Sequence, residues 1–331
     1  MIAVITTIQS PTESVLTLLR QLRPAQAELI VIGDRKGPAE YPLAGVQFFS
    51  LADQLATSLH MASALPIGHY ARKNLGYLIA IGQKADCIYE TDDDNAPNGS
   101  WQARSLRTRA RKIEARPWAN VYRMFSEANI WPRGFPLDII ADPETFRNDV
   151  TESDELDAPI QQGLANLSPD VDAIWRLFLD RDFAFEDNDS VWLPPNTWCP
   201  FNSQTTWWWP PAYPLLYLPS YCSFRMTDIW RSFVAQRCLW ELGYGLVFHR
   251  PEVDQQRNVH SLMRDFEDEV PGYLHNRRIV QALEPLNLRS GVESVSQNLR
   301  TCYEELVRIA AVPEKELELV DAWLEDLAGI Q

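Results

Sequence analysis

Cysteine is scarce in this chain of 331 residues. It occurs five times, at wide spacings and without a CxxC pair. That pattern disfavours a structural zinc site or a disulfide framework, and it favours a reducing cytoplasm. No apolar run reaches the roughly 18 residues of a membrane span, and the N-terminus lacks the basic segment of a signal peptide. We therefore expect a cytoplasmic protein, with peripheral attachment at the inner membrane surface left open.

Positive charge is also in short supply. Lys and Arg number 30 against 45 Asp and Glu, so the formal net charge is -15. Non-specific nucleic-acid binding depends on Lys and Arg contacts to phosphate, so this composition excludes it. A phosphorylated ligand remains possible where a metal ion or a few arginines gather locally.

Strand and helix patterns alternate over the first hundred residues. Short apolar strands at Ile2 to Thr7, Glu28 to Ile32, Val46 to Ser50 and Asp86 to Glu90 are separated by helical patterns. This alternation with short connections predicts a parallel sheet within an α/β sandwich. Ligands in such folds bind at the carboxyl ends of the strands. Asp34 and the run Asp92 to Asp94 all follow such strand ends.

Three consecutive aspartates, Asp92, Asp93 and Asp94, follow one of these strands in CIYETDDDN. Adjacent carboxylates repel one another unless a cation lies among them. Mg²⁺ and Mn²⁺ take carboxylate oxygens and leave positions open for substrate phosphates. Because neighbouring residues of a strand point to opposite sides, Asp92 and Asp94 can face one cleft. The alternative is a solvated acidic turn.

The stretch ARKNLGYLIAIGQKADCIYETDDDN resembles the STELLO family of glycosyltransferases, whose members share an RKN-x-GY helix and a YETDDDN strand end. Further matching pieces are WPRGFPLDII (131–140), IQQGLANLSPDVDAIWRL (160–177), PFNSQTTWW (200–208) and LPSYCSFRMTDIWRSFVAQRCLWELG (218–243). The layout is more weakly similar to the reversibly glycosylated polypeptides, which act as UDP-arabinopyranose mutases. The resemblance covers residues 1 to 270.

This resemblance implies an α/β fold of GT-A type, with a Rossmann-like mixed central sheet, flanking helices and a C-terminal helical tail. It implies a glycosyltransferase domain over 1–272, with a nucleotide-binding half (1–116) and an acceptor-side half (117–272), and a helical extension over 273–331. The implied reaction is transfer of a sugar from a nucleotide-diphosphate sugar, using Mn²⁺ or Mg²⁺. A UDP-sugar is the expected donor. The acceptor, which is a glycan, a lipid-linked group or a protein, stays open, as does oligomerisation.

Carried onto this sequence, the resemblance implies a binding site and a set of metal ligands. The nucleotide-sugar residues are Thr6, Thr7, Asp34, Arg72, Lys73, Asn74, Asp92, Asp93, Arg250 and Arg257, and the metal ligands are Asp92, Asp94 and His249. A helix N-terminus after Arg72 favours an anion. The alternatives are a surface basic pair at Arg72 and Lys73, a turn at Asp34 and a structural role for His249.

The catalytic base has three candidates. Asp170 and Asp172 lie in SPDVDAIWRL, and Asp228 lies in FRMTDIWR, each beside a predicted helix start. An inverting transferase needs a carboxylate that takes the proton of the acceptor hydroxyl. Helix capping is the alternative role for these residues. Neighbouring arginines at 225 and 231 are expected to lower the pKa of Asp228 and favour an ion pair.

Two other functions stay open. A mutase or self-glycosylating protein requires an arginine that becomes modified, for which Arg133 in WPRG is the candidate. A non-catalytic scaffold of the same fold is the other, with the acidic C-terminal helices and the aromatic loops as its interface with a protein partner. The repulsive aspartate cluster argues against a scaffold, which has no need of it.

Overall fold

The computed structural model describes residues 1–256 and 261–330. Its strands are β1 (Ile2–Thr7), β2 (Glu28–Gly33), β3 (Val46–Phe49), β4 (Ile88–Thr91), β5 (Asn95–Pro97), β6 (Arg107–Ile113), β7 (Val150–Asp157), β8 (Ile160–Asn166), β9 (Val191–Leu193), β10 (Thr205–Trp208) and β11 (Leu246–Gln255). Its α-helices are α1 (Glu13–Leu22), α2 (Leu51–Leu55), α3 (His60–Ala64), α4 (Lys73–Gly82), α5 (Ala173–Leu179), α6 (Thr227–Trp240), α7 (Leu262–Leu283), α8 (Val295–Arg308) and α9 (Glu316–Ile330).

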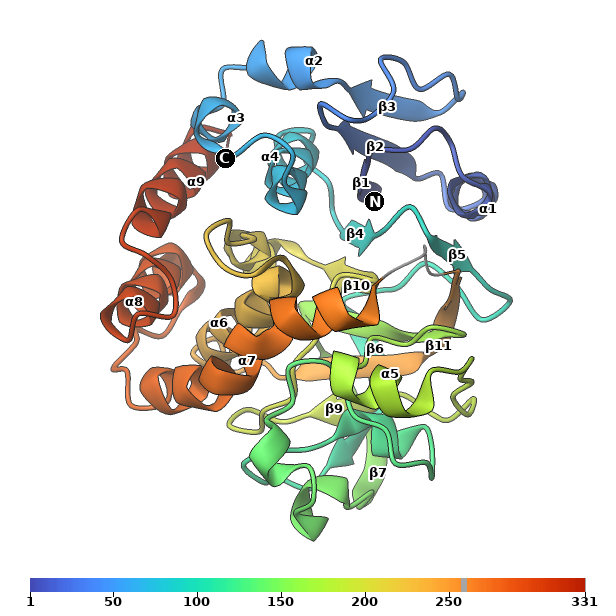
Figure 1. Cartoon of the computed structure of the whole chain (residues 1–331), viewed down its shortest axis with the longest axis vertical. Helices are drawn as coiled ribbons and strands as arrows, with labels where there is room; N and C mark the ends of the chain where they lie inside the picture. Colours follow the sequence, from blue (N-terminus) through green and yellow to red (C-terminus); the bar gives the residue numbers. More distant parts are fainter. Residues whose placement is uncertain (257–260, 331) are drawn as a thin grey trace.

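All of these strands belong to one mixed sheet, in the order β3-β2-β1-β4-β10-β8-β11-β9-β6-β7, with β5 paired to β11. The first four strands are parallel, as the strand–helix alternation predicted. Strand β10 then runs antiparallel to both β4 and β8, which joins the two halves of the sheet. Figure 1 shows the parallel part at the top and β7 at the opposite end. The predicted α/β fold class, with a mixed central sheet, flanking helices and a helical C-terminal part, is confirmed.

The parallel strands are largely apolar because helices cover both of their faces, and Glu90 of β4 is a buried exception. Val4 of β1 packs with Ile32 in the core on the α4 side, whereas Ile5 packs on the α1 side. Helix α4 lies so close to the sheet that a Cβ on Gly76 would come within 2.5 Å of Val4. Glycine at this position therefore allows the approach of α4 that places the residues before it at the end of β4.

The C-terminal helices dock on the same core. Trp323 of α9 is fully buried and donates from Nε1 to the Pro214 carbonyl, while Asp326 accepts from the backbone N–H groups of His60 and Met61 at the start of α3. In Figure 1, α8 and α9 stand along one side of the molecule, with α9 beside α3. The division predicted at residue 273 falls inside the continuous helix α7.

Candidate functional site

A cavity of about 490 Å³ opens at the carboxyl ends of β1, β2 and β4. We call it the aspartate cavity. Of the residues predicted for the site, its lining contains Thr6, Thr7, Asp34, Arg72, Asp92, Asp93, Asp94, Asp170 and Asp228. The structure therefore brings together predicted residues from both halves of the chain. This is the place where parallel α/β sheets bind their ligands.

Each of the three consecutive aspartates has a different partner. Asp92 Oδ1 accepts hydrogen bonds from Lys73 Nζ at 2.8 Å and from the Tyr70 hydroxyl at 2.9 Å. Asp93 accepts from the Thr7 hydroxyl, and Asp94 Oδ2 accepts from the side-chain amide of Gln255 at 3.2 Å. The fully buried Lys73 is therefore the cation beside the cluster, and it contacts only the first aspartate.

One ammonium does not neutralise three carboxylates. Burial raises the pKa of Asp92, although the charge of Lys73 partly lowers it. Burial also raises the pKa of Asp93. Burial, with the charges of its two neighbours, raises the pKa of Asp94 to about 7. Ionising all three aspartates together is therefore unfavourable, and a divalent cation at the cluster would favour their ionised form.

The oxygen donors of Asp92 and Asp94 suit a hard cation such as Mg²⁺ or Mn²⁺. Within residues 1–256 and 261–330, no group of three or more His, Cys, Asp or Glu side chains is arranged to hold a metal ion. A cation here would accordingly take at most two carboxylates from the chain, with its other positions filled by ligand phosphates and water. Mg²⁺ is commonly bound in this way.

His249 does not join the aspartates. It lies fully buried in β11, with Nε2 2.9 Å from Gln161 Oε1 and Nδ1 2.7 Å from Ser190 Oγ. Both ring nitrogens already have partners within the chain, and the residue does not line the aspartate cavity. Burial, with the nearby charges of Arg104 and Arg250, holds the pKa of His249 well below its usual range. The predicted ligand role has no geometric support, because a metal ligand needs a free ring nitrogen at the metal.

Two residues predicted to contact the nucleotide instead hold the fold together. Arg72 is buried and donates to Gln54 Oε1 at 2.7 Å and to the carbonyls of Leu65 and Ala62. Asn74 exchanges two hydrogen bonds with the backbone of Leu218. The donors of Arg72 are therefore used by α2 and α3, and the arginine is not available to clamp a phosphate.

Asp34 shapes the rim of the cavity. Its two carboxylate oxygens accept from the backbone N–H groups of Gly68 and His69, each at 2.9 Å. These bonds hold the loop that leads into Tyr70 and Lys73 above the end of β2. Asp34 retains acceptor capacity toward the cavity, because each carboxylate oxygen carries two lone pairs.

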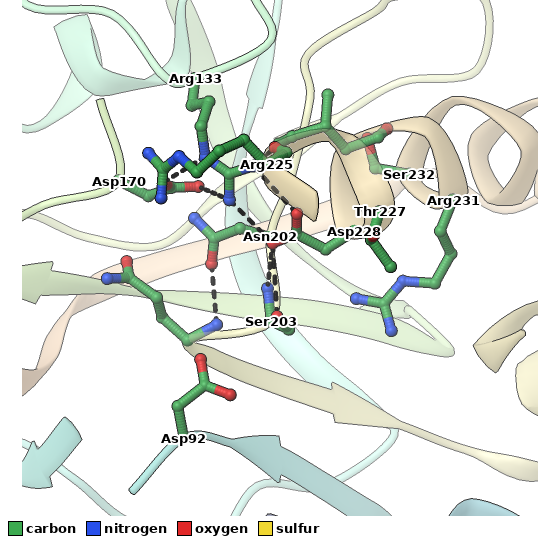
Figure 2. Close-up of polar contacts among 12 residues, drawn as sticks. Asp92, Arg133, Asp170, Asn202, Ser203, Arg225, Thr227, Asp228, Arg231 and Ser232 are labelled. Atoms are coloured by element: carbon green, nitrogen blue, oxygen red, sulfur yellow. Dashed lines mark hydrogen bonds and ion pairs between the residues drawn. The ribbon is translucent and has the colours of Figure 1, made fainter. Parts of the chain in front are cut away.

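Two of the predicted bases share one arginine, as Figure 2 shows. Arg133 donates to Asp170 from Nε at 2.7 Å and Nη2 at 2.9 Å, and to Asp228 from Nη1 at 3.0 Å and Nη2 at 2.9 Å. All three side chains are buried. Burial alone would raise the pKa of Asp228, but the charge and hydrogen bonds of Arg133 outweigh it and hold that pKa below its ordinary value.

This pairing makes Asp228 a poor proton acceptor. Sequence reasoning anticipated an ion pair at Asp228 but assigned it to the arginines at 225 and 231. It named Arg133 only as a residue that a mutase would modify, and the guanidinium instead holds two carboxylates. A signal was present, since an arginine among the apolar residues of WPRGFP has to be paired if it is buried.

Tyr70 and Ser203 connect the aspartates to this arginine, and sequence reasoning missed both. The Ser203 hydroxyl lies 2.6 Å from the Tyr70 hydroxyl and 3.3 Å from Asp228 Oδ2. A row of polar contacts therefore runs from Asp92 through Tyr70 and Ser203 to Asp228, and because Tyr70 donates to Asp92, the single Ser203 proton goes either to Tyr70 or to Asp228. It couples the nucleotide-binding half of the site to the acceptor-side half.

Asp172, the remaining predicted base, caps a helix. Its carboxylate accepts from the backbone N–H of Trp175 at 2.8 Å and from Trp131 Nε1 at 2.6 Å, and it does not line the aspartate cavity. The structure therefore supports the capping alternative. Burial raises the pKa of Asp172 to about 6.

Replacing Asp172 with Asn should stabilise the protein increasingly as the pH rises. A raised folded-state pKa contributes stability that is present below the unfolded value of about 4 and is lost as the pH rises through about 6. Asn keeps one oxygen for the cap, loses the bond from Trp131 Nε1 and cannot ionise, so between pH 4 and pH 8 its stability should rise by about 2–3 kcal/mol relative to that of the wild type. Urea unfolding across this range measures the difference, with the exposed N-cap variant Asp142→Asn as control. A constant difference at all pH values would refute this account.

Arg250 does not line the aspartate cavity. Arg250 forms an ion pair with Asp187 at 2.7 Å and lines a different cavity. Arg257 lies outside the described residues.

Comparison with known proteins adds to this geometry. The family of STELLO glycosyltransferases matches residues 225–331. Two Arabidopsis thaliana proteins, each named as a probable glycosyltransferase, are 27% identical to this chain: STELLO1 over 99% of it and STELLO2 over 91%. The predicted resemblance to the STELLO glycosyltransferases is confirmed. It reaches beyond the predicted limit at residue 270, because the family match includes the C-terminal helices and the STELLO1 match covers 99% of the chain.

The chain spans less than half the length of these STELLO relatives, 44% of STELLO1 and 41% of STELLO2. A crystal structure of a mycobacterial protein covers 95% of this chain and 76% of its own, with a TM-score of 0.39 and 9% identity, and this likeness is too distant to bear on function. Among the described helices, none combines the length and the apolar character needed to cross a bilayer.

Proposed function

We propose that this chain transfers a sugar from a nucleotide-diphosphate sugar to an acceptor hydroxyl, with Mn²⁺ or Mg²⁺ held by Asp92 and Asp94. A UDP-sugar is the first candidate for the donor. One observation carries the proposal: the three consecutive aspartates, of which only Asp92 pairs with Lys73, line a cavity of about 490 Å³ at the carboxyl ends of parallel strands. The STELLO resemblance supports the same reaction class. When bound, the cation neutralises the negative charge that develops on the departing diphosphate.

The residues of the chain have separate tasks in this proposal. Lys73 and Tyr70 orient Asp92, and Thr7 holds Asp93. Thr6 and Asp34 line the side of the cavity where the base and ribose would lie. Fixed partners of this kind preorganise the charged groups, so that little reorganisation is needed during the reaction.

On the acceptor side, Arg133 occupies both Asp170 and Asp228. An inverting transfer needs a carboxylate free to accept the proton of the acceptor hydroxyl. The ion-paired state of these residues favours transfer with retained configuration. We also propose a cytoplasmic location, which the five free cysteines favour. The acceptor stays open between a glycan, a lipid-linked group and a protein.

Thermal unfolding against a nucleotide panel tests the function. With Mn²⁺ or Mg²⁺, UDP at about 100 times its dissociation constant should stabilise the folded chain by about 2.7 kcal/mol. The effect should require the metal and should disappear in Asp92→Ala and in Asp94→Ala. It should persist in Asp154→Ala, which removes an exposed aspartate far along the sheet in β7. Stabilisation by a different nucleotide would mean that the donor is not a UDP-sugar. If no nucleotide stabilises the chain, the transferase proposal fails and a non-catalytic scaffold of this fold remains.

A further inference from the structure

A second cavity, of about 530 Å³, lies beside β6, β9 and β11, and the proposed function does not use it. Its lining includes three arginines, Arg104, Arg109 and Arg250, and a single acidic residue, Asp189. We call it the arginine cavity. Such a group of guanidinium ions is unexpected on a chain whose net charge is -15, so it does not reflect the overall charge of the protein.

The arginines differ in how much of their hydrogen-bonding capacity is used. Arg104 pairs with the fully buried Glu252, yet its Nε is buried without a hydrogen-bond partner among the described residues. Arg250 pairs through Nη1 with Asp187 on the exposed side. Arg109 is exposed and has no ion-pair partner within the described parts of the chain. The cavity therefore offers the guanidinium of Arg109, unpaired within residues 1–256 and 261–330, beside two arginines that each share their charge with one carboxylate.

The floor of the cavity has a defined hydrogen-bond direction. The side-chain N–H₂ of Gln161 donates to three backbone carbonyls, at 2.9 to 3.2 Å, so its Oε1 must accept from His249 Nε2. His249 Nδ1 is then an acceptor, and the hydroxyl that it faces belongs to Ser190, at 2.7 Å. Ser190 lines the cavity with its proton committed to His249, and its oxygen can therefore only accept from a ligand.

A ligand that matches this cavity needs two features. It must carry an oxyanion for the arginines, whose planar forks bind phosphate through two N–H groups. It must also carry a hydroxyl that donates to Ser190 Oγ. We propose that the arginine cavity binds a sugar phosphate, with its phosphate on Arg104, Arg109 and Arg250 and a sugar hydroxyl on Ser190. This proposal is independent of the nucleotide-sugar function of the aspartate cavity.

Calorimetric titration without divalent cations tests it, because ligand binding in the aspartate cavity is proposed to need the metal. The probes are glucose 6-phosphate and inorganic phosphate. Arg109→Gln should weaken both by about tenfold or more, since a charged hydrogen bond is lost. Arg107→Gln is the matched control, because Arg107 lies two residues away on β6, pairs with Asp157 and does not line the cavity. Ser190→Ala should weaken glucose 6-phosphate but not inorganic phosphate.

The histidine ring reports where the anion binds. Burial and the charges of Arg104 and Arg250 depress the pKa of His249, and an anion on these arginines offsets the charges. The ring ¹⁵N resonances should therefore shift on addition of glucose 6-phosphate, and Arg109→Gln should need about tenfold more of it for the same shift. Binding that leaves His249 unchanged, or equal affinity in Arg109→Gln and wild type, would overturn the proposal. Arg109→Gln should also keep the metal-dependent UDP stabilisation, which separates this test from that of the aspartate cavity.

Discussion

Replacing Arg133 with alanine is expected to lower the free energy of unfolding by about 3–5 kcal/mol. The substitution leaves Asp170 and Asp228 buried, close together and without their shared cation. Urea denaturation measures the loss. Arg277→Ala serves as control, because Arg277 pairs with Asp138 at an exposed position, where ion pairs contribute about 0–1 kcal/mol.

The same variant should reverse a pH dependence. In the wild type, the lowered pKa of Asp228 contributes stability that is present above its unfolded value of about 4 and is lost as the pH falls through the folded value. Without Arg133, burial is opposed only by the charges of Arg231 and Arg225, so we expect this pKa to rise. The contribution is then present at low pH and lost as the pH rises. Introducing Asp170→Asn and Asp228→Asn into Arg133→Met should recover much of the stability. A loss below about 1 kcal/mol in Arg133→Ala would contradict the role of Arg133 as the shared cation of these two carboxylates.

Replacing Arg231 with methionine should have an effect of similar size, about 3–5 kcal/mol. Arg231 of α6 donates to Glu90 of β4 at 2.8 Å, and both side chains are fully buried. Its guanidinium also stacks on Trp208, with 5.0 Å to the ring centroid. Removing the arginine leaves Glu90 as a buried charge with only the neutral donors Tyr77 and Trp208.

The double variant Glu90→Gln with Arg231→Met distinguishes a lost ion pair from lost packing. If the unpaired charge dominates, the double variant is more stable than Arg231→Met, and the double-mutant cycle gives a coupling energy of about 1–3 kcal/mol. Additive losses would show that packing dominates. Because Glu90 precedes Asp92 by two residues, Arg231→Met should also weaken metal-dependent nucleotide binding, which the thermal assay reads directly.

Several features of the site were predictable because they depend on local pattern. Alternating strands and helices predict the parallel sheet, and the aspartates after β4 must lie at its carboxyl edge. The cost of Gly76 inside α4 predicts close packing, and the distance to Val4 bears this out. The STELLO resemblance depends on such short stretches, and the comparisons agree with it.

What the local pattern could not supply is the partner of each charged side chain. Arg72 and Lys73 are adjacent basic residues with the same sequence signal. Arg72 nevertheless donates to the Gln54 side chain and to the carbonyls of Ala62 and Leu65, while Lys73 pairs with Asp92. Likewise, His249 has the residue type of a metal ligand but lies in the interior against Ser190 and Gln161. Residue type limits the possible partners, and the position of distant chain segments selects among them.

The sequence by itself determined the α/β class, the strand end that carries Asp92 to Asp94 and the family resemblance, because each of these depends on a short contiguous pattern. Tertiary structure alone decided that Arg133 holds Asp170 and Asp228, and that Arg231 neutralises Glu90. The partners of these pairs lie 37, 95 and 141 residues apart. A buried charge must find an opposite charge, but only the completed packing of the sheet against α6 brings these particular residues within hydrogen-bonding distance.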